Sequence, residues 1–124
     1  MILGLGCDLA GIERLRNAVS RPGVLDKVFT PAEKREAARY REPGSYYAGR
    51  WAAKEAAAKA LGCGFGSGCS FTDIEVLNDE LGAPRLNCKA PAAKAFNDGK
   101  LRFLVSISHE KAYAVATVVI ETSE

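Results

Sequence analysis

The sequence has few of the features that mark membrane proteins. Its 124 residues include one histidine, one tryptophan and one methionine, and the longest mainly apolar stretch lies near residues 112–120. That stretch is far shorter than the roughly 20 residues that cross a bilayer. The apolar N-terminal run has no positively charged start and ends at Asp8, so it does not resemble a signal peptide. We therefore expect a cytoplasmic protein that does not bind a membrane.

The net charge is small, and cysteines are few. Seventeen basic and fifteen acidic side chains leave a net charge of +2, too little for a general nucleic-acid binder. Residues 1–60 nevertheless carry a net +4 and residues 61–124 a net −2, so an electropositive surface should come from the first half. The four cysteines form no Cys-x-x-Cys pair and none adjoins the histidine, which favours free thiols over a disulfide framework or a zinc site.

What is present is an ordered series of strand and helix patterns. Apolar alternation and turn residues predict strands at 2–8, 71–77, 84–89, 101–108 and 112–120. Helical spacing and capping signals predict helices at 11–20, 30–41, 45–61 and 91–98. The segment 112–120 is apolar on both sides, which is typical of a central strand, and the turn at 109–111 should make it a hairpin with 101–108. The order favours an α+β fold: a small, mainly antiparallel sheet packed with one long helix and shorter helices, in a single domain over residues 1–124.

The first predicted strand has two glycines and a carboxylate on one side. Gly4, Gly6 and Asp8 share one phase of the alternation, while the other phase is apolar. Glycine weakens a strand and often marks a place where backbone or a ligand approaches closely. We expect such an approach beside Asp8.

The long helix separates small side chains from charged ones. At 100° per residue, a smooth alanine face is formed by Ala52, Ala53, Ala56, Ala57 and Ala60. This face suits close packing against a sheet or another subunit. The opposite half holds Arg50, Lys54, Glu55 and Lys59. Two interpretations are open: a solvated face with an ordinary Glu55–Lys59 ion pair, or a site in which Glu55 holds a cation and the lysines hold anionic oxygens. Asp8 would supply a second carboxylate, and two carboxylates with phosphate oxygens and waters suit Mg²⁺.

Three weaker signals also leave alternatives open. His109 ends a predicted strand and is either a core or turn histidine or a group that meets an anion. The glycine-rich segment 62–68 lacks the Gly-Lys-Ser/Thr ending of a phosphate-binding loop, which favours a helix stop and connector. Arg14, Arg16 and Arg21 form either a solvated helix face or a basic edge for an acidic partner.

Taken in order, these segments resemble the 4′-phosphopantetheinyl transferases. The resemblance rests on Gly6-x-Asp8, on Arg50-Trp51-Ala52-Ala53-Lys54-Glu55-Ala56-Ala57-Ala58-Lys59-Ala60-Leu61-Gly62 and on Ser106-Ile107-Ser108-His109. It continues through Phe71-x-Asp73-Ile74-Glu75-Val76 and Asn78-Asp79-Glu80-Leu81-Gly82-Ala83-Pro84, and so covers essentially the whole chain. The short length is similar to the holo-[acyl-carrier-protein] synthase branch, whose members are single-domain homotrimers.

The resemblance implies a transferase of fatty acid biosynthesis. Such an enzyme moves 4′-phosphopantetheine from coenzyme A to a serine of apo-acyl carrier protein and releases adenosine 3′,5′-bisphosphate. By the same resemblance, Asp8 and Glu55 hold Mg²⁺, and Lys59 lies near the phosphates as a third catalytic residue. The general base is left open between Glu55 and a metal-ordered water.

The resemblance also implies how the partners bind. Arg50 and His109 match positions near the adenosine end of coenzyme A and its 3′-phosphate, and the turn at Gly82 and Pro84 matches a segment near the adenine. Arg14 and, more loosely, Arg21 match the helix that receives the acidic carrier protein. The active site then lies at a subunit boundary of the homotrimer, and no nucleic acid is involved.

Two positions depart from the family pattern, and two rival functions remain. Ala83 stands where relatives often carry a basic residue, and Glu110 follows His109 where a small hydroxyl residue is common. One rival is a transferase that serves polyketide or peptide-synthase carriers. The other is a non-catalytic module that binds carrier protein or nucleic acid.

Overall fold

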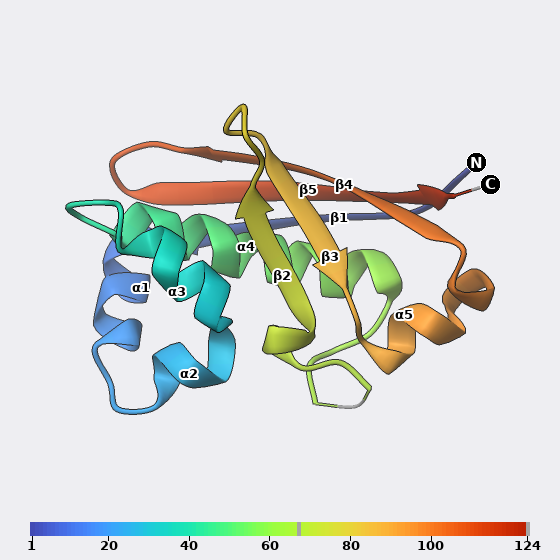
Figure 1. The fold of residues 1–124 in the computed structure, drawn as a ribbon, viewed down its shortest axis with the longest axis horizontal. Coiled ribbons are helices and arrows are strands. Elements are labelled where there is room, and N and C mark those ends of the chain that lie inside the picture. The colour runs from blue at the N-terminus through green and yellow to red at the C-terminus, as the bar shows by residue number, and fades with distance from the viewer. Residues whose placement is uncertain (67, 124) are drawn as a thin grey trace.

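The longest helix lies against one side of a three-stranded sheet in the computed structural model, which describes residues 1–66 and 68–123 (Figure 1). The strands are β1 (Ile2–Gly11), β2 (Ile74–Asn78), β3 (Pro84–Cys88), β4 (Leu101–His109) and β5 (Tyr113–Thr122). The helices are α1 (Ile12–Val19), α2 (Val24–Val28), α3 (Pro31–Ala37), α4 (Gly44–Leu61) and α5 (Pro91–Ala95), with 3-10 turns η1 (Phe71–Asp73) and η2 (Phe96–Gly99). The helices all lie on one side of the larger sheet.

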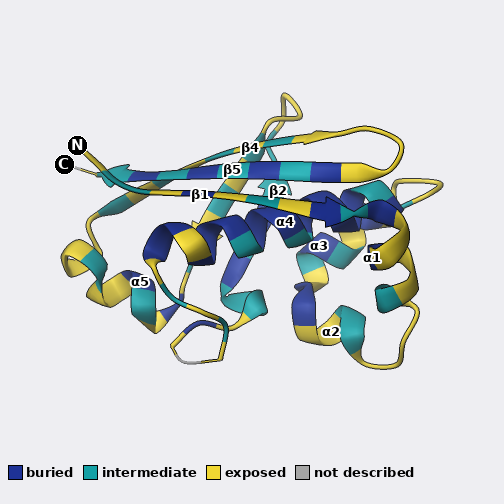
Figure 2. Cartoon of the chain, turned by 180° about the vertical axis from the view of Figure 1, so that it is seen from behind, coloured by how far each residue is buried: buried dark blue, intermediate teal, exposed yellow. Residues whose placement is uncertain are grey.

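Both sheets are antiparallel, and β5 is the central strand of the larger one. The order is β1-β5-β4, and β2 pairs with β3 in a separate two-stranded sheet. The α+β prediction is confirmed, as are the central strand and the late hairpin. Alternate residues of β5, from Ala114 to Ile120, are buried against α4, which is itself largely buried (Figure 2). Among the described residues, no helix is long and apolar enough to cross a membrane.

The structure differs from the sequence prediction in several places. Strand β1 continues to Gly11 rather than ending at residue 8, and helix α5 ends at Ala95 rather than at residue 98. Helix α2 was not predicted, because five residues are too short to show a helical period; it follows Gly23, whose φ is +82°. Its last residue, Val28, packs into a second small core with Tyr46 and Tyr47. Helix α3 ends at residue 37 rather than 41. Residues 71–73 form a 3-10 turn rather than the start of a strand, and the Asp73 carboxylate accepts from the Ser70 backbone amide at 2.9 Å across this turn.

Helix α4 crosses the sheet so that its two halves meet opposite edges. A Cβ built on Gly4 would lie 2.3 Å from the Ala60 carbonyl oxygen, and one on Gly6 only 1.9 Å from that of Ala56. The C-terminal half therefore rests directly on β1, and the predicted close approach is by backbone. In the N-terminal half, a Cβ on Gly49 would lie 2.9 Å from Cγ2 of Ile107, on β4. The alanine face thus packs on the sheet, one of its two expected partners.

Two of the four charged residues on the opposite half of α4, Arg50 and Lys54, are buried and not solvated. Lys54 and Glu33 are both fully buried, with their side-chain charges 2.9 Å apart. Lys54 also donates to the carbonyl oxygens of Phe71 and Ile74. Glu33 caps α3 through the Thr30 amide and accepts from the Val76 amide on β2. A buried ion must be paired and hydrogen-bonded, and this pair meets that need by joining α3, α4 and β2. The Lys54 ammonium is therefore fully used inside the protein and does not bind a ligand's anion.

Candidate active site

Asp8, Glu55 and Lys59 gather where α4 crosses β1. The Lys59 ammonium donates to Oδ1 of Asp8 at 2.9 Å and to the Cys7 carbonyl oxygen at 3.1 Å. Burial and the nearby Asp8 charge raise the pKa of Glu55, against the opposing effect of Lys59. Lys59 pairs with Asp8 and not, within the described residues, with Glu55, so the simple helix-surface pair that the spacing suggested is replaced by one between helix and strand.

The local sequence explains how these three side chains meet. Gly4 and Gly6 let the α4 backbone touch β1, and Asp8 is the next residue in the same strand phase. Glu55 and Lys59 are four residues apart and so share one face of the helix. The strand and the helix together therefore place two carboxylates and one ammonium at the edge of the sheet.

This donor set fits Mg²⁺. Mg²⁺ prefers oxygen ligands and usually keeps several waters, bound by one or two carboxylates together with substrate phosphates. Asp8 and Glu55 supply two such carboxylates, and the pKa of Glu55 is raised by its burial and then by the negative charge of Asp8 close by. Across residues 1–66 and 68–123, no three His, Cys, Asp or Glu side chains form a closed metal cage. A bound ion would therefore take its remaining ligands from water and from a substrate.

Arg50 and His109 lie together at the other edge of the sheet. Both line a pocket of about 220 Å³ between α4 and the end of β4. Arg50 is only 6% exposed, and its guanidinium contacts Glu36, Asn78 and the ring of Tyr46. His109 is exposed, so the structure gives no support to the alternative of a core histidine.

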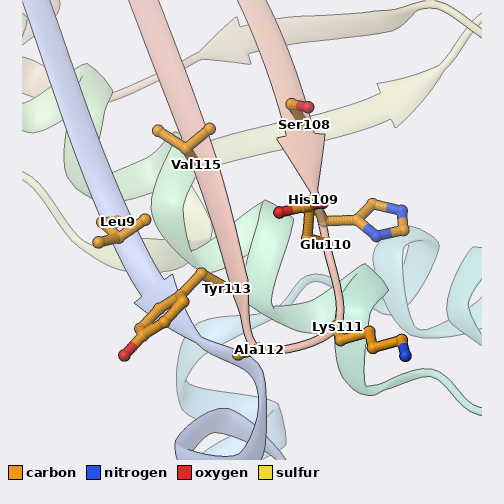
Figure 3. Close-up of a pocket in the computed structure, with 8 residues that line it drawn as sticks. All are labelled: Leu9, Ser108, His109, Glu110, Lys111, Ala112, Tyr113 and Val115. Carbon is orange, nitrogen blue, oxygen red and sulfur yellow. The ribbon is translucent and has the colours of Figure 1, made fainter.

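His109 also borders a wider hollow at the β4–β5 turn. This second pocket, of about 430 Å³, includes Glu110 and Lys111 (Figure 3). In that view the imidazole projects away from Leu9 and Tyr113, which lie on the far side of the pocket. Glu110, one of the two departures from the family pattern, is exposed beside His109 and next to the cationic Lys111.

The two clusters do not meet within one chain. Asp8 is on β1 and His109 on β4, with the central β5 between them. Two strand intervals alone separate them by about 10 Å. The helix accounts for this separation, because Arg50 projects from the half over β4 and Glu55 from the half over β1.

The turn between β2 and β3 is organised by an aspartate that sequence reasoning did not single out. Oδ1 of Asp79 accepts from the amides of Leu81 and Ala83, and Oδ2 accepts from Arg85. The bond from the Ala83 amide, followed by the Arg85 side chain, holds the pKa of Asp79 below its usual range. An aspartate two residues before an amide that it can accept from is a recognisable turn signal. Gly82, with φ +87°, and Pro84 are thereby fixed at an exposed hairpin end.

Arg14 and Arg21 border an apolar pocket between α1, α2 and α4. Its volume is about 250 Å³, and its wall includes Leu15, Phe29 and Trp51. Both arginines are exposed. The sequence did not predict the pocket, because helix α2, which forms one of its sides, is too short to show a helical period.

Residues 4–118 match the family model described as the 4′-phosphopantetheinyl transferase superfamily. The chain belongs to this superfamily. It is 46% identical to the holo-[acyl-carrier-protein] synthase of Alteromonas mediterranea over 123 residues, which is 98% of each chain.

Solved structures of other superfamily members agree with this assignment. A crystal structure of the Bacillus anthracis holo-(acyl-carrier-protein) synthase in complex with CoA (3′,5′-ADP) matches at a TM-score of 0.85 and 36% identity, covering 99% of both chains. The Helicobacter pylori synthase in complex with coenzyme A matches at 0.83 and 31% identity, over 94% of this chain and 99% of that one. This transferase therefore has the fold of enzymes crystallised with the coenzyme.

Proposed function

We propose that this transferase is a holo-[acyl-carrier-protein] synthase that works in the cytoplasm in fatty acid biosynthesis, as one domain over residues 1–124. It moves 4′-phosphopantetheine from coenzyme A to a serine of apo-acyl carrier protein. The observation that carries the proposal is the meeting of Asp8, Glu55 and Lys59 in a chain that belongs to this superfamily. Relatives that match nearly its whole length are holo-[acyl-carrier-protein] synthases.

The residue types suit the reaction. The serine oxygen attacks the phosphorus that bears the pantetheine arm. The bond from that phosphorus to the bridging oxygen breaks, and adenosine 3′,5′-bisphosphate leaves with the bridging oxygen. Negative charge grows on the bridging oxygen, where the Lys59 ammonium can stabilise it. Glu55, whose pKa is raised by burial and by Asp8, is a carboxylate suited to accept the serine proton. A water beside it could accept the proton instead.

Asp8 and Glu55 would hold Mg²⁺ at this site. When bound, the ion supplies positive charge to the phosphate oxygens of the coenzyme. Lys59 already pairs with Asp8, so the chain balances part of the acidic charge before any ligand arrives.

The outer face of the larger sheet supports a homotrimer. This face, on the side away from α4, presents rows of apolar side chains such as Leu5, Val119 and Leu104, which are cross-strand neighbours. Leu5 is 66% and Leu104 44% exposed, and Leu9 and Tyr113 extend the patch. An uncovered apolar sheet face of this kind marks a protein interface.

A subunit boundary would also complete the site. The 3′-phosphate and the diphosphate of coenzyme A are attached to one ribose, whereas Arg50 and His109 lie at the opposite sheet edge from Asp8. Association of the β4 edge of one subunit with the β1 edge of its neighbour would bring the two clusters to one coenzyme molecule. Gly82 and Pro84 would then lie near the adenine.

Carrier protein would dock beside α1. Arg14 and Arg21 supply positive charge around an apolar pocket, and acyl carrier proteins are acidic. Arg14→Glu should raise the KM for carrier protein severalfold, more at low salt, and leave the KM for coenzyme A unchanged. Equal losses for both substrates would argue against this docking surface.

Mass spectrometry tests the reaction itself. The protein is incubated with an apo-carrier, coenzyme A and Mg²⁺, and the carrier should gain the mass of one 4′-phosphopantetheine. The same carrier with its acceptor serine changed to alanine is the control. A carrier that binds but gains no mass would favour a non-catalytic module, and faster modification of a polyketide or peptide-synthase carrier would change the assigned substrate.

A further inference from the structure

Glu36 on α3 links two parts of the chain that the proposed function assigns to coenzyme A. Its Oε1 accepts from the Tyr46 hydroxyl at 2.7 Å and from Nη2 of Arg50 at 3.0 Å. Its Oε2 accepts from the Asn78 amide at 3.1 Å. The carboxylate is only 12% exposed, so these bonds lie mostly out of water. Glu36 therefore ties α4 to the end of β2.

The first link fixes the orientation of the Arg50 guanidinium. Nη2 contacts Glu36 and Oδ1 of Asn78, while Nε donates to the Val76 carbonyl oxygen at 3.2 Å. The guanidinium carbon lies 4.2 Å from the centre of the Tyr46 ring. The Tyr46 ring thus covers one face of the guanidinium group, and hydrogen bonds to protein atoms occupy its Nε and Nη2 positions.

The remaining edge of Arg50 is the one that a ligand can reach. Nη1 has no hydrogen-bond partner among the described residues, and no unpartnered side-chain nitrogen or oxygen there is fully buried. Nη1 therefore keeps contact with solvent, and Arg50 lines the pocket of about 220 Å³ that it shares with His109. A guanidinium held in this way presents one N–H edge at a fixed place and loses little freedom when it meets an anion.

The second link fixes the turn that follows β2. Asn78 is the last residue of β2, and the next residue, Asp79, organises the turn through Gly82 and Pro84. One carboxylate therefore sets the relative positions of Arg50 and this hairpin end.

We propose that Glu36 is a positioning residue that gives this transferase its preference for coenzyme A over 3′-dephospho-coenzyme A. It acts by holding Arg50 so that Nη1 meets the 3′-phosphate in the pocket beside His109. The proposal rests on the proposed function, since that function makes coenzyme A the ligand. Glu36 does not touch the reacting phosphate and should not affect the chemical step.

Calorimetric titration of the wild-type protein and of Glu36→Gln with both nucleotides tests the proposal. Glu36→Gln keeps the size of the side chain and removes its charge. Its affinity for coenzyme A should fall about tenfold, while its affinity for 3′-dephospho-coenzyme A should change less than about twofold. With carrier protein present, the KM for coenzyme A should rise with little change in kcat. Glu42→Gln, a matched change at an exposed glutamate outside these contacts, should keep the wild-type preference.

Two further measurements keep the outcome decisive. Glu36→Asp retains the charge and should recover part of the preference, which also serves if Glu36→Gln folds poorly. Equal losses for both nucleotides, or an unchanged preference in Glu36→Gln, would overturn the inference. A wild-type protein that binds coenzyme A selectively but modifies no carrier would refute the proposed reaction and leave this inference standing.

Discussion

The two halves of α4 are built in opposite ways. The C-terminal half lies on β1 through small residues, with Ala56 and Ala60 against Gly6 and Gly4. The N-terminal half lies among polar groups, where Arg50 contacts Glu36 and Asn78. In the C-terminal half, the charged side chains lie at or near the surface beside Asp8. In the N-terminal half, they are buried and hydrogen-bonded. One helix thus carries a partly solvent-exposed cluster and a buried, internally bonded one.

The difference follows from what lies against each half. Backbone contact with a sheet leaves no room for side chains, so charges on that half must project sideways into water. The small sheet of β2 and β3 and helix α3 instead offer the other half carbonyl oxygens and carboxylates. Buried polar groups of this kind keep a definite arrangement only when every partner is present. We expect the two halves to respond differently to mutation.

The largest effect should come from Gly6→Ala. The added Cβ would lie 1.9 Å from the Ala56 carbonyl oxygen, and because that atom is backbone, the helix must move. We expect a loss of about 3 kcal/mol or more in the free energy of unfolding, measured by urea denaturation. Gly64→Ala has nothing within 4 Å of the added Cβ and is the control. A small effect of Gly6→Ala would contradict the backbone contact.

Asp8→Ala and Glu55→Gln should each disrupt the cluster of Asp8, Glu55 and Lys59 without unfolding the protein. Each should lower turnover at least about tenfold, equivalent to about 1.4 kcal/mol, because a carboxylate that would hold Mg²⁺ beside the phosphate oxygens is lost. Turnover is measured on apo-carrier at saturating Mg²⁺, and circular dichroism checks the fold. Near-normal turnover in either variant would refute the assigned role.

Mixing two variants, each impaired in one of the two clusters, should show whether the two halves of α4 serve one site from different subunits. Asp8→Ala and His109→Ala, unfolded together in equal amounts and refolded, should recover about a quarter of wild-type activity, since random trimers pair intact edges in one boundary of four. Each variant refolded alone is the control. Light scattering should give three times the 13.2 kDa chain mass. No recovery in confirmed mixed trimers would place both clusters of a site on one subunit.

Gly49→Ala should perturb the N-terminal half only mildly. Its new Cβ would lie 2.9 Å from Cγ2 of Ile107, which is a side-chain atom that can shift. We expect a loss of about 1 kcal/mol in the free energy of unfolding, well below that of Gly6→Ala. Equal losses of unfolding free energy in Gly49→Ala and Gly6→Ala would show that both halves of α4 are packed equally tightly on the sheet.

The smallest effect should be a loss of stability at high pH through Tyr46. Burial, followed by the hydrogen bond to Glu36, raises the pKa of Tyr46 above its ordinary value of 10.0. The unfolded chain therefore releases this proton at a lower pH than the folded chain. The contribution is complete below about pH 10 and declines as pH rises further. The urea midpoint should fall between pH 9 and 11 in the wild type and less steeply in Tyr46→Phe.

Much of the architecture was readable in the sequence. The alternation at 101–108 and the two-sided apolar run at 112–120 predicted the hairpin and the central strand, because side chains alternate strictly along a strand. The alanine stripe predicted a close contact for α4. Helix α2 was missed, because five residues make hardly more than one turn.

The polar residues were harder to place. Helical spacing put Lys54 among solvent-facing or ligand-facing charges, yet it is buried with Glu33. The capping pattern at Thr30 and Glu33 indicated a helix start but could not show that the same carboxylate also reaches Lys54 and β2. Asp79 carried a turn signal that was not used, whereas Glu36 gave no signal of its role beyond residue type, because its partners depend on how α3 docks against α4 and β2.

By itself, the sequence determined all the strands and the helices except α2, the small-residue contact between strand and helix, and the residue types from which a phosphate-binding site can be made. These are local properties, fixed by side-chain size, periodicity and spacing. Only the tertiary structure decided which charges meet: Asp8 with Lys59 at one edge of the sheet, and Arg50 with Glu36 at the other. The reason is geometric, because the angle at which α4 crosses the sheet determines the neighbours of each charge, and that angle follows from packing of the whole chain.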